Sequence, residues 1–320
     1  MNGFTHFMTA ALMAIVQLAL VLVGGPLLLG VMRKVRSRLE GRFGAPVHQP
    51  LLDLRKLFTK QRLRPRESSW LFGAGPLVLV ATVACVSAIS PLATTRPPLG
   101  QSTDFFAVIF ALLLGSVVLA LAALDTGTAF AGMGASRSMT IGALAEPALL
   151  VAILAMAIPA RTSNLPALVR AGLSHPALIA SPSRVLALAS FLVVILAESG
   201  RLPVDNPSTH LELTMIHEAM VLEYSGPDLG LIILGESMRL AFLLGLLVNL
   251  LVPWGVADRP GALFFIIGVV ALAAKVLVTG VAIATFEVFT AKMRLFRLPE
   301  LLAGGFVLAL LGAVTAVVAR

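Results

Sequence analysis

The sequence is poor in the residues that hold redox cofactors and metals, with one cysteine and five histidines among its 320 residues. Iron–sulfur clusters and thiolate zinc sites need several cysteines, so a chain whose single cysteine is Cys85 is not expected to hold them. The histidines are too few and too peripheral to ligate a haem between two membrane helices. No Walker loop and no GxGxxG pattern occurs. We therefore expect no cofactor, no metal and no catalytic centre in this chain.

Charge is scarce as well. Charged residues make up 12% of the chain, about half of the roughly 25% found in soluble domains. Hydrophobic residues make up 58%, and the mean hydropathy is +0.97. A soluble domain of this length could not bury so much apolar surface, so most of it must face lipid or other membrane helices. Strand-like alternation of polar and apolar residues is absent, and the composition predicts an all-α, polytopic membrane helix bundle.

About eight stretches are long and apolar enough to span a bilayer, since a span needs about 20 mostly apolar residues. They are Phe7–Met32, Trp70–Ala93, Phe105–Leu124, Thr140–Ala160, Val185–Ala197, Leu229–Val252, Ala262–Phe286 and Leu301–Val318. The fifth is short and runs directly into a charged segment. We predict one integral membrane domain over residues 1–320, with cytoplasmic loops at about 33–69, 125–139, 198–228 and 287–300.

The distribution of charge predicts which side each loop faces. Inner loops hold 16 of the 24 basic residues, 11 of them between Arg33 and Arg66. Because basic residues favour the cytoplasmic side, we expect both termini on the outer side of the cytoplasmic membrane. The acids follow the same asymmetry, since only Asp104 and Asp258 fall in outer loops. Topology does not require acids, so we expect a polar, partly buried cytoplasmic face.

One segment concentrates these acids. Residues 198–228, ESGRLPVDNPSTHLELTMIHEAMVLEYSGPD, contain six of the 16 acids of the chain. Asn206–Pro207 is a favourable helix start and Gly226–Pro227 a favourable stop, so we expect a cytoplasmic helix over Pro207–Tyr224 between the fifth and sixth spans. Polar residues fall on two faces of this helix rather than one. The pattern favours a wedge between a hydrated cavity in the membrane and a docked partner.

Two simpler interpretations of the segment compete with this one. A zinc site of the HExxH type fails, because the residue four positions after His217 is Val221. His210 and His217 are two helical turns apart, too far to share a metal without help. The second alternative is a solvated loop whose charges only keep it soluble.

Several ionisable residues fall within or at the ends of the predicted spans. They are Glu146, Glu198, Glu236, Arg239, Lys275 and Glu287. Because burying an isolated charge in hydrocarbon is costly, such groups face cavities or one another. Glu236 and Arg239 are three residues apart and are expected to pair. The set predicts a proton path, and structural ion pairing is the alternative.

Three long stretches resemble the respiratory complex I subunit 1 family. They are AESGRLPVDNPSTHLELTMIHEAMVLEYSG (residues 197–226), RLEGRFGAPVHQPLLDLRKLFTK (38–60) and AGMGASRSMTIGALAEPALL (131–150). The resemblance is to the branch found in membrane-bound nickel–iron hydrogenases of the formate hydrogenlyase kind. It implies a membrane subunit that anchors an electron-transfer arm and couples it to proton or sodium translocation.

The resemblance also implies partners and residue roles. The partners would be hydrogenase-like large and small subunits, which carry the nickel–iron centre and iron–sulfur clusters, and antiporter-like membrane subunits. The expected partner-docking residues are Arg42, Gln49, Asp53, Lys56, Arg137, Arg201, Asp205, His210 and His217. The expected ion-translocation residues are Glu146, Glu198, Glu212, Glu218, Glu223, Glu236, Arg239 and Lys275. Redox turnover in the arm would shift the segment Pro203–Gly226 and so move protons through the buried carboxylates.

One departure separates this chain from the quinone-using branch. That branch carries RxPFDLxExExEL, whereas Val204-Asp205-Asn206-Pro207 stands here in place of the Phe-Asp-Leu step, and His210 and His217 appear. The difference favours hydrogen chemistry over quinone binding. A quinone-site subunit of a NADH:quinone oxidoreductase, a stand-alone ion carrier and a passive anchor remain the alternatives.

Overall fold

The computed structural model describes residues 2–97, 103–175, 179, 181–205, 215–259, 261–291, 293 and 297–318, and these residues are all-helical apart from loops and two isolated bridges. Their helices, in chain order, are α1 (Asn2–Leu39), α2 (Gln49–Phe58), α3 (Trp70–Ile89), α4 (Phe105–Leu124), α5 (Ala129–Ala160), α6 (Leu165–Ser174), α7 (Pro182–Glu198), α8 (His217–Val221), α9 (Gly226–Leu251), α10 (Ala262–Phe289) and α11 (Leu298–Val318). The predicted all-α class is confirmed.

Seven of the described helices are long and apolar enough to cross a membrane: α1, α3, α4, α5, α9, α10 and α11. The fifth predicted span corresponds to α7, which has 17 residues. At 1.5 Å per residue this helix is about 25 Å long, the short end of what a span requires. The chain is therefore a multi-pass membrane protein.

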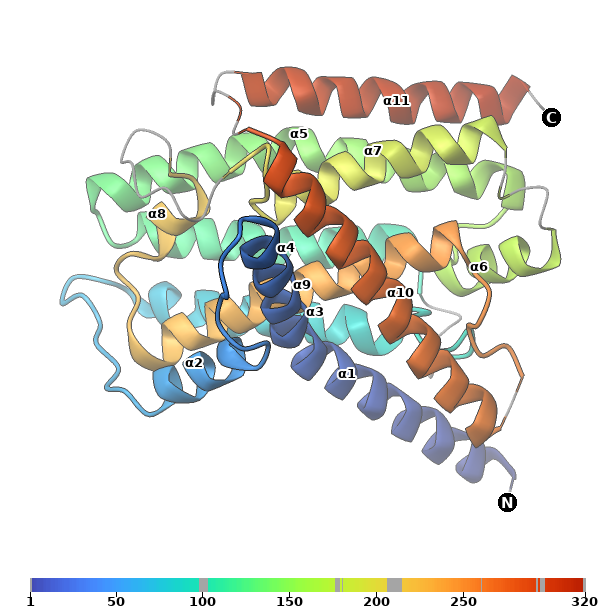
Figure 1. Ribbon diagram of the computed structural model, residues 1–320, viewed down its shortest axis with the longest axis horizontal. Helices are drawn as coiled ribbons and strands as arrows, with labels where there is room; N and C mark the ends of the chain where they lie inside the picture. Colours follow the sequence, from blue (N-terminus) through green and yellow to red (C-terminus); the bar gives the residue numbers. More distant parts are fainter. Residues whose placement is uncertain are drawn as a thin grey trace.

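The long helices form one bundle (Figure 1). α3 packs against α4 and α9, and α5 packs against α4, α7 and α11. α1 and α10 pack against each other and run obliquely across the rest. The short helices α2 and α8 lie at one end of the bundle, which we call the α8 end, and α6 lies at the other, the α6 end. The start of α1 and the finish of α11 both lie at the α6 end.

Polar residues at the helix starts fix where several spans begin. The side chains of Ser69, Asp104 and Asn164 each accept a backbone N–H of the helix that follows, which supplies partners for groups that a helix leaves unsatisfied at its start. Ser69 and Asp104 immediately precede the predicted starts of the second and third spans, and Asn164 caps the short helix α6.

Four features of the loops differ from the sequence prediction. The loop expected over 125–139 is helical from Ala129 onward, because α5 continues beyond the membrane-length stretch. The loop expected over 33–69 contains the whole of α2, and α6 was not expected. Within the predicted helix Pro207–Tyr224, residues 206–214 lie outside the described part, and α8 covers His217–Val221. A turn ends α8 because Tyr224 is buried, stacking on Phe72 of α3 with ring centroids 4.1 Å apart.

Candidate functional site

Charged side chains from four helices meet inside the bundle near the α8 end. We call this the central cluster: Glu146 of α5, Glu198 of α7, His217 of α8, and Glu236 and Arg239 of α9. Its centre is an ion pair between the Arg239 guanidinium and the Glu198 carboxylate, whose side chains are 12% and 9% exposed. The guanidinium also donates to the hydroxyl of Ser116 on α4. A paired and hydrogen-bonded arrangement is what a buried charge requires.

The expected pairing of Glu236 with Arg239 is wrong. Both residues lie on α9, but the Arg239 guanidinium pairs with Glu198 of α7, a contact between helices that neighbouring positions on one helix cannot predict. Glu236 instead lies within electrostatic reach of His217, Arg239 and Glu218. More than a third of its surface is exposed in the isolated chain.

Glu146 is the third carboxylate of the central cluster. It lies within electrostatic reach of Glu198 and Arg239. Its Oε1 atom is buried and makes no hydrogen bond in the described part of the chain. The carboxylates of Glu146, Glu198 and Glu236 are therefore arranged around one guanidinium, with one anionic charge neutralised directly.

The segment that carries α8 is fastened to α5. A Cβ atom at Gly134 would lie 2.8 Å from both the Ala219 Cβ atom and the Met220 nitrogen, so the two backbones touch. Arg137 Nη1 donates to the Met215 carbonyl at 2.8 Å. Arg137, predicted as a docking residue, thus holds the segment in place within the chain.

The loop after α7 is fastened to α10. Arg201 Nη1 lies 3.4 Å from Glu287 Oε1, and these side chains are 12% and 2% exposed. Burial lowers the pKa of Arg201, while the Glu287 carboxylate opposes that shift. Asp205 nearby is buried, and the backbone N–H of Met293 donates to the Pro203 carbonyl at 2.9 Å. The arrangement joins the start of the acidic segment to the end of α10.

Asp228 is a site residue for which the sequence suggested no role. It is 1% exposed, lies in the first turn of α9, and its Oδ2 atom is 2.6 Å from Arg62 Nε and 4.0 Å from Arg64 Nε. The sequence did contain a signal for this residue. Asp228 directly follows Gly226–Pro227, and the N-terminal end of a helix favours a negative charge. The ion pairs fasten the basic first loop onto the end of the acidic segment.

The remaining predicted docking residues lie at the surface of the α8 end. Arg42 is exposed and pairs with Glu40. On α2, Gln49 Nε2 donates to Asp53 Oδ1 at 2.9 Å, and the side chains of Asp53 and Lys56 are exposed. Glu223, predicted as an ion-translocation residue, is exposed beyond α8 and does not join the central cluster. The predicted docking residue His210 and the predicted ion-translocation residue Glu212 lie outside the described residues.

Lys275 does not join the central cluster. Its Nζ atom donates to the Val252 carbonyl at 2.6 Å and to Asn249 Oδ1 at 3.4 Å, at the C-terminal end of α9. Asn249 and Glu236 are 13 residues apart on that helix, or about 20 Å at 1.5 Å per residue. The structure therefore brings together Glu146, Glu198, Glu236 and Arg239, and leaves Lys275 toward the α6 end.

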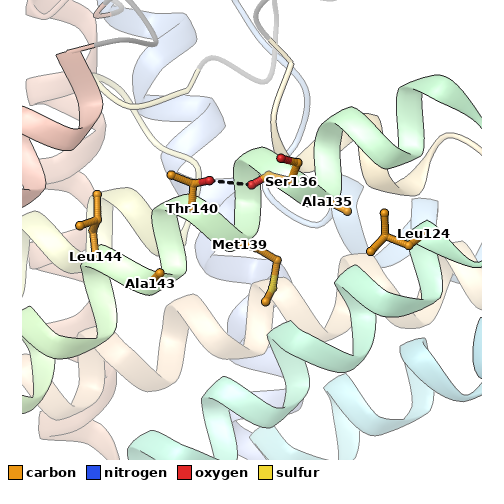
Figure 2. A pocket seen from close by; sticks show the side chains of 7 residues that line it. All are labelled: Leu124, Ala135, Ser136, Met139, Thr140, Ala143 and Leu144. Carbon is orange, nitrogen blue, oxygen red and sulfur yellow. Dashed lines mark hydrogen bonds between the residues drawn. The ribbon is translucent and has the colours of Figure 1, made fainter.

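A shallow groove runs between α4 and α5 (Figure 2). It is lined by Leu124, Ala135, Ser136, Met139, Thr140, Ala143 and Leu144. The Thr140 hydroxyl donates to the Ser136 carbonyl on its own helix, so the groove offers mainly apolar surface. Among the described residues, no group of three or more histidine, cysteine, aspartate or glutamate side chains is placed to hold a metal ion.

Comparison with known proteins places this arrangement in a family. The model of the NADH dehydrogenase family, which includes complex I subunit 1, matches residues 10–318. The chain belongs to the complex I subunit 1 family. Formate hydrogenlyase subunit 4 of Escherichia coli is 31% identical over 306 residues, covering 96% of this chain and 98% of that protein. Hydrogenase-4 component C of the same organism is 31% identical, with 93% of each chain covered.

Two further proteins are similar, one over a shorter stretch and one in its fold. A subunit of the NADH-quinone oxidoreductase of Syntrophotalea carbinolica is 30% identical, covering 75% of this chain and 76% of that protein. A chain in the structure of the membrane-bound sulfane sulfur reductase, an archaeal respiratory membrane complex, has a TM-score of 0.82, covering 96% of this chain and 99% of that chain at 21% identity. That last likeness establishes the fold. The chain is thus homologous to membrane subunits of redox complexes.

Proposed function

We propose that this chain is the membrane subunit on which the electron-transfer arm of a nickel–iron hydrogenase-like complex docks, and that the central cluster couples the arm to translocation of protons or sodium ions. The observation that carries the proposal is the buried ion pair of Arg239 with Glu198, flanked by Glu146 and Glu236. Ionisable groups gathered inside a membrane bundle are costly unless they serve an ion path or one another. One carboxylate is enough to neutralise the Arg239 guanidinium, so ion pairing alone does not explain the two further carboxylates beside the pair.

Docking is supported by the character of the α8 end. Exposed Arg42, Asp53, Lys56 and Glu223 supply charges of both signs there, as expected for the polar rim of an interface. Beneath them, Arg137 and Arg201 tie the acidic segment to the membrane helices α5 and α10, and Asp228 ties it to the basic first loop. A displacement imposed by a docked partner would therefore reach the central cluster through fixed contacts rather than through a free loop.

The hydrogenase branch is favoured over the quinone branch by the extent of similarity. Formate hydrogenlyase subunit 4 matches nearly the whole chain, whereas the quinone oxidoreductase subunit matches three quarters of it. The expected partners are hydrogenase-like large and small subunits and antiporter-like membrane subunits. The basic first loop supports a cytoplasmic location of the α8 end, with both termini on the outer side of the cytoplasmic membrane.

The test is the number of ions translocated per electron pair by the assembled complex in sealed membrane vesicles. We expect Glu146→Gln and Glu236→Gln to lower this ratio at least tenfold while the arm still co-purifies, because a glutamine cannot carry a proton. Glu67→Gln, at an exposed carboxylate in the loop before α3 that is outside the docking set, should leave the ratio unchanged. Unchanged ratios in both buried variants would overturn the proposal.

A further inference from the structure

Three polar atoms of the central cluster share an unusual property. Glu146 Oε1, Arg239 Nε and His217 Nδ1 are all buried, and none has a hydrogen-bond partner in the described part of the chain. Buried polar groups nearly always have partners, and where the protein supplies none, a bound water typically does. Three such atoms, from three different helices of one cluster, are positions whose hydrogen bonds bound water would complete.

His217 is the member of this group that belongs to the docking segment. It is the first residue of α8, whereas Glu146 and Arg239 lie on the membrane helices α5 and α9. From α9, Glu236 lies within electrostatic reach of it, and Glu218 and Arg239 are the other charged groups around that carboxylate. The imidazole thus belongs to the segment that a partner would contact and lies within electrostatic reach of a carboxylate on a membrane helix.

The backbone opposite His217 leaves room for the ring. A Cβ atom at Gly200 would lie 3.0 Å from His217 Nδ1, and Gly200 has a φ of +56°, which residues with a Cβ atom adopt only with strain. Glycine is therefore needed at position 200 both for its conformation and for the space it leaves. The buried face of the imidazole lies against a backbone that is shaped around it.

We propose that His217 is a proton relay, passing protons through bound water between the α8 segment and Glu236. A neutral imidazole has one protonated and one free nitrogen, so it can take a proton on one and release a proton from the other. The released proton passes by way of water to the Glu236 carboxylate, or moves in the reverse direction, and the ring returns to the neutral form. No electron is transferred in the step. The inference rests on the proposed function and names the group through which protons enter the central cluster.

A purely structural histidine would hold α8 in place and would not need to ionise. The two roles separate in His217→Gln, because glutamine keeps a hydrogen-bonding side chain of similar reach but cannot relay a proton. His48→Gln is the matched control. His48 is an exposed histidine at the start of α2, at the same end of the bundle and outside the central cluster.

The experiment measures protons translocated per electron pair by the assembled complex in sealed vesicles, together with co-purification of the partner subunits. We expect His217→Gln to assemble and to lower the ratio at least tenfold, with His48→Gln unchanged. Added imidazole should restore part of the ratio in His217→Ala, since a diffusible relay can occupy the space that the shorter side chain leaves. A ratio above half the normal value in His217→Gln, or no rescue of His217→Ala by imidazole, would overturn the relay.

Glu236→Gln, measured alongside, separates this inference from the proposed function. If Glu236→Gln lowers the ratio and His217→Gln does not, the relay is wrong and coupling through the central cluster stands. If neither variant changes the ratio, both proposals fall. If both lower it and imidazole rescues only the histidine variant, both are supported.

Discussion

Individual residues of the α8 end differ sharply in what their charges contribute. The Arg239–Glu198 pair is almost enclosed, with side chains 12% and 9% exposed, whereas Arg36 and Glu40 pair with side chains 23% and 25% exposed at the end of α1. Removing one partner of a buried pair leaves the other charge uncompensated in a low-dielectric interior. Surface pairs contribute little, because water already solvates both groups.

Arg239→Ala should therefore lower the free energy of unfolding by about 3–5 kcal/mol, and Arg36→Ala by no more than about 1 kcal/mol. The combined change Arg239→Gln with Glu198→Gln should recover most of the loss, because it leaves no isolated charge. Denaturant unfolding of the detergent-solubilised chain checks both values. Equal losses for Arg239→Ala and Arg36→Ala would show that the Arg239–Glu198 pair is solvated rather than buried.

Asp228 gives a second prediction at this scale. Asp228→Asn removes the charge that holds Arg62 and Arg64, so the first loop should detach and trypsin should cut after these arginines at least several times faster. Asp53→Asn, which changes an exposed aspartate on the same side, should not alter the cleavage rate. Timed digestion of the purified chain measures the difference. Equal rates in the two variants would mean that Asp228 does not hold the loop.

At the scale of helices, contact between α5 and α8 depends on a single glycine. A Cβ atom at Gly134 would lie 2.8 Å from Ala219 and Met220, whereas one at Gly142, two turns along the same helix, would meet nothing within 4 Å. Gly134→Ala should thus separate α8 from α5. Gly142→Ala should be neutral or stabilising by up to about 1 kcal/mol, because alanine favours helix.

Thermal unfolding of the two glycine variants tests this contact directly. We expect a lower melting temperature for Gly134→Ala than for the unmodified chain, and an unchanged or higher one for Gly142→Ala. Translocation by the assembled complex should fall with the first substitution only, since α8 carries His217. A melting temperature in Gly134→Ala equal to that of Gly142→Ala would contradict the close packing of α8 on α5.

Sequence reasoning predicted the long helices well and the short ones poorly. Spans near Phe105–Leu124 and Ala262–Phe286 follow from length and hydropathy alone, because lipid requires both. The helices α2 and α6 have 10 residues each, too few for such a signal. The charged residues of the central cluster were identified, but the partner of Arg239 was not. Hydrophobic periodicity predicts which residues share a face of one helix, but it does not predict that Arg239 of α9 pairs with Glu198 of α7.

The whole molecule has two unlike ends. α2, α8 and the charged loops lie at the α8 end, while the start of α1 and the finish of α11 lie at the α6 end, well apart from each other (Figure 1). At the α6 end, cations from other helices satisfy carbonyls at the finish of α9: Arg184 donates to Leu250 and Lys275 donates to Val252. That end is held by hydrogen bonds within the chain, and the α8 end presents charged side chains outward.

This asymmetry predicts the orientation in the membrane. In a variant with Cys85 replaced by serine, a cysteine at Asp53 should react with a membrane-impermeant maleimide only from the cytoplasmic side. A cysteine at Arg259, in the loop before α10, should react only from the outer side. Labelling of intact cells and of inverted vesicles distinguishes the two. Reaction of both cysteines from the same side would contradict the assignment.

We propose that the charged rim around α8 is a junction between this membrane bundle and an electron-carrying partner. Site-specific photo-crosslinking of the assembled complex tests this junction, with the photoreactive residue at exposed Glu223 and a control at Arg259. We expect the Glu223 probe to become joined to an iron–sulfur or hydrogenase-like subunit and the Arg259 probe not to. An intact, active complex in which the Glu223 probe reaches no other subunit would contradict it.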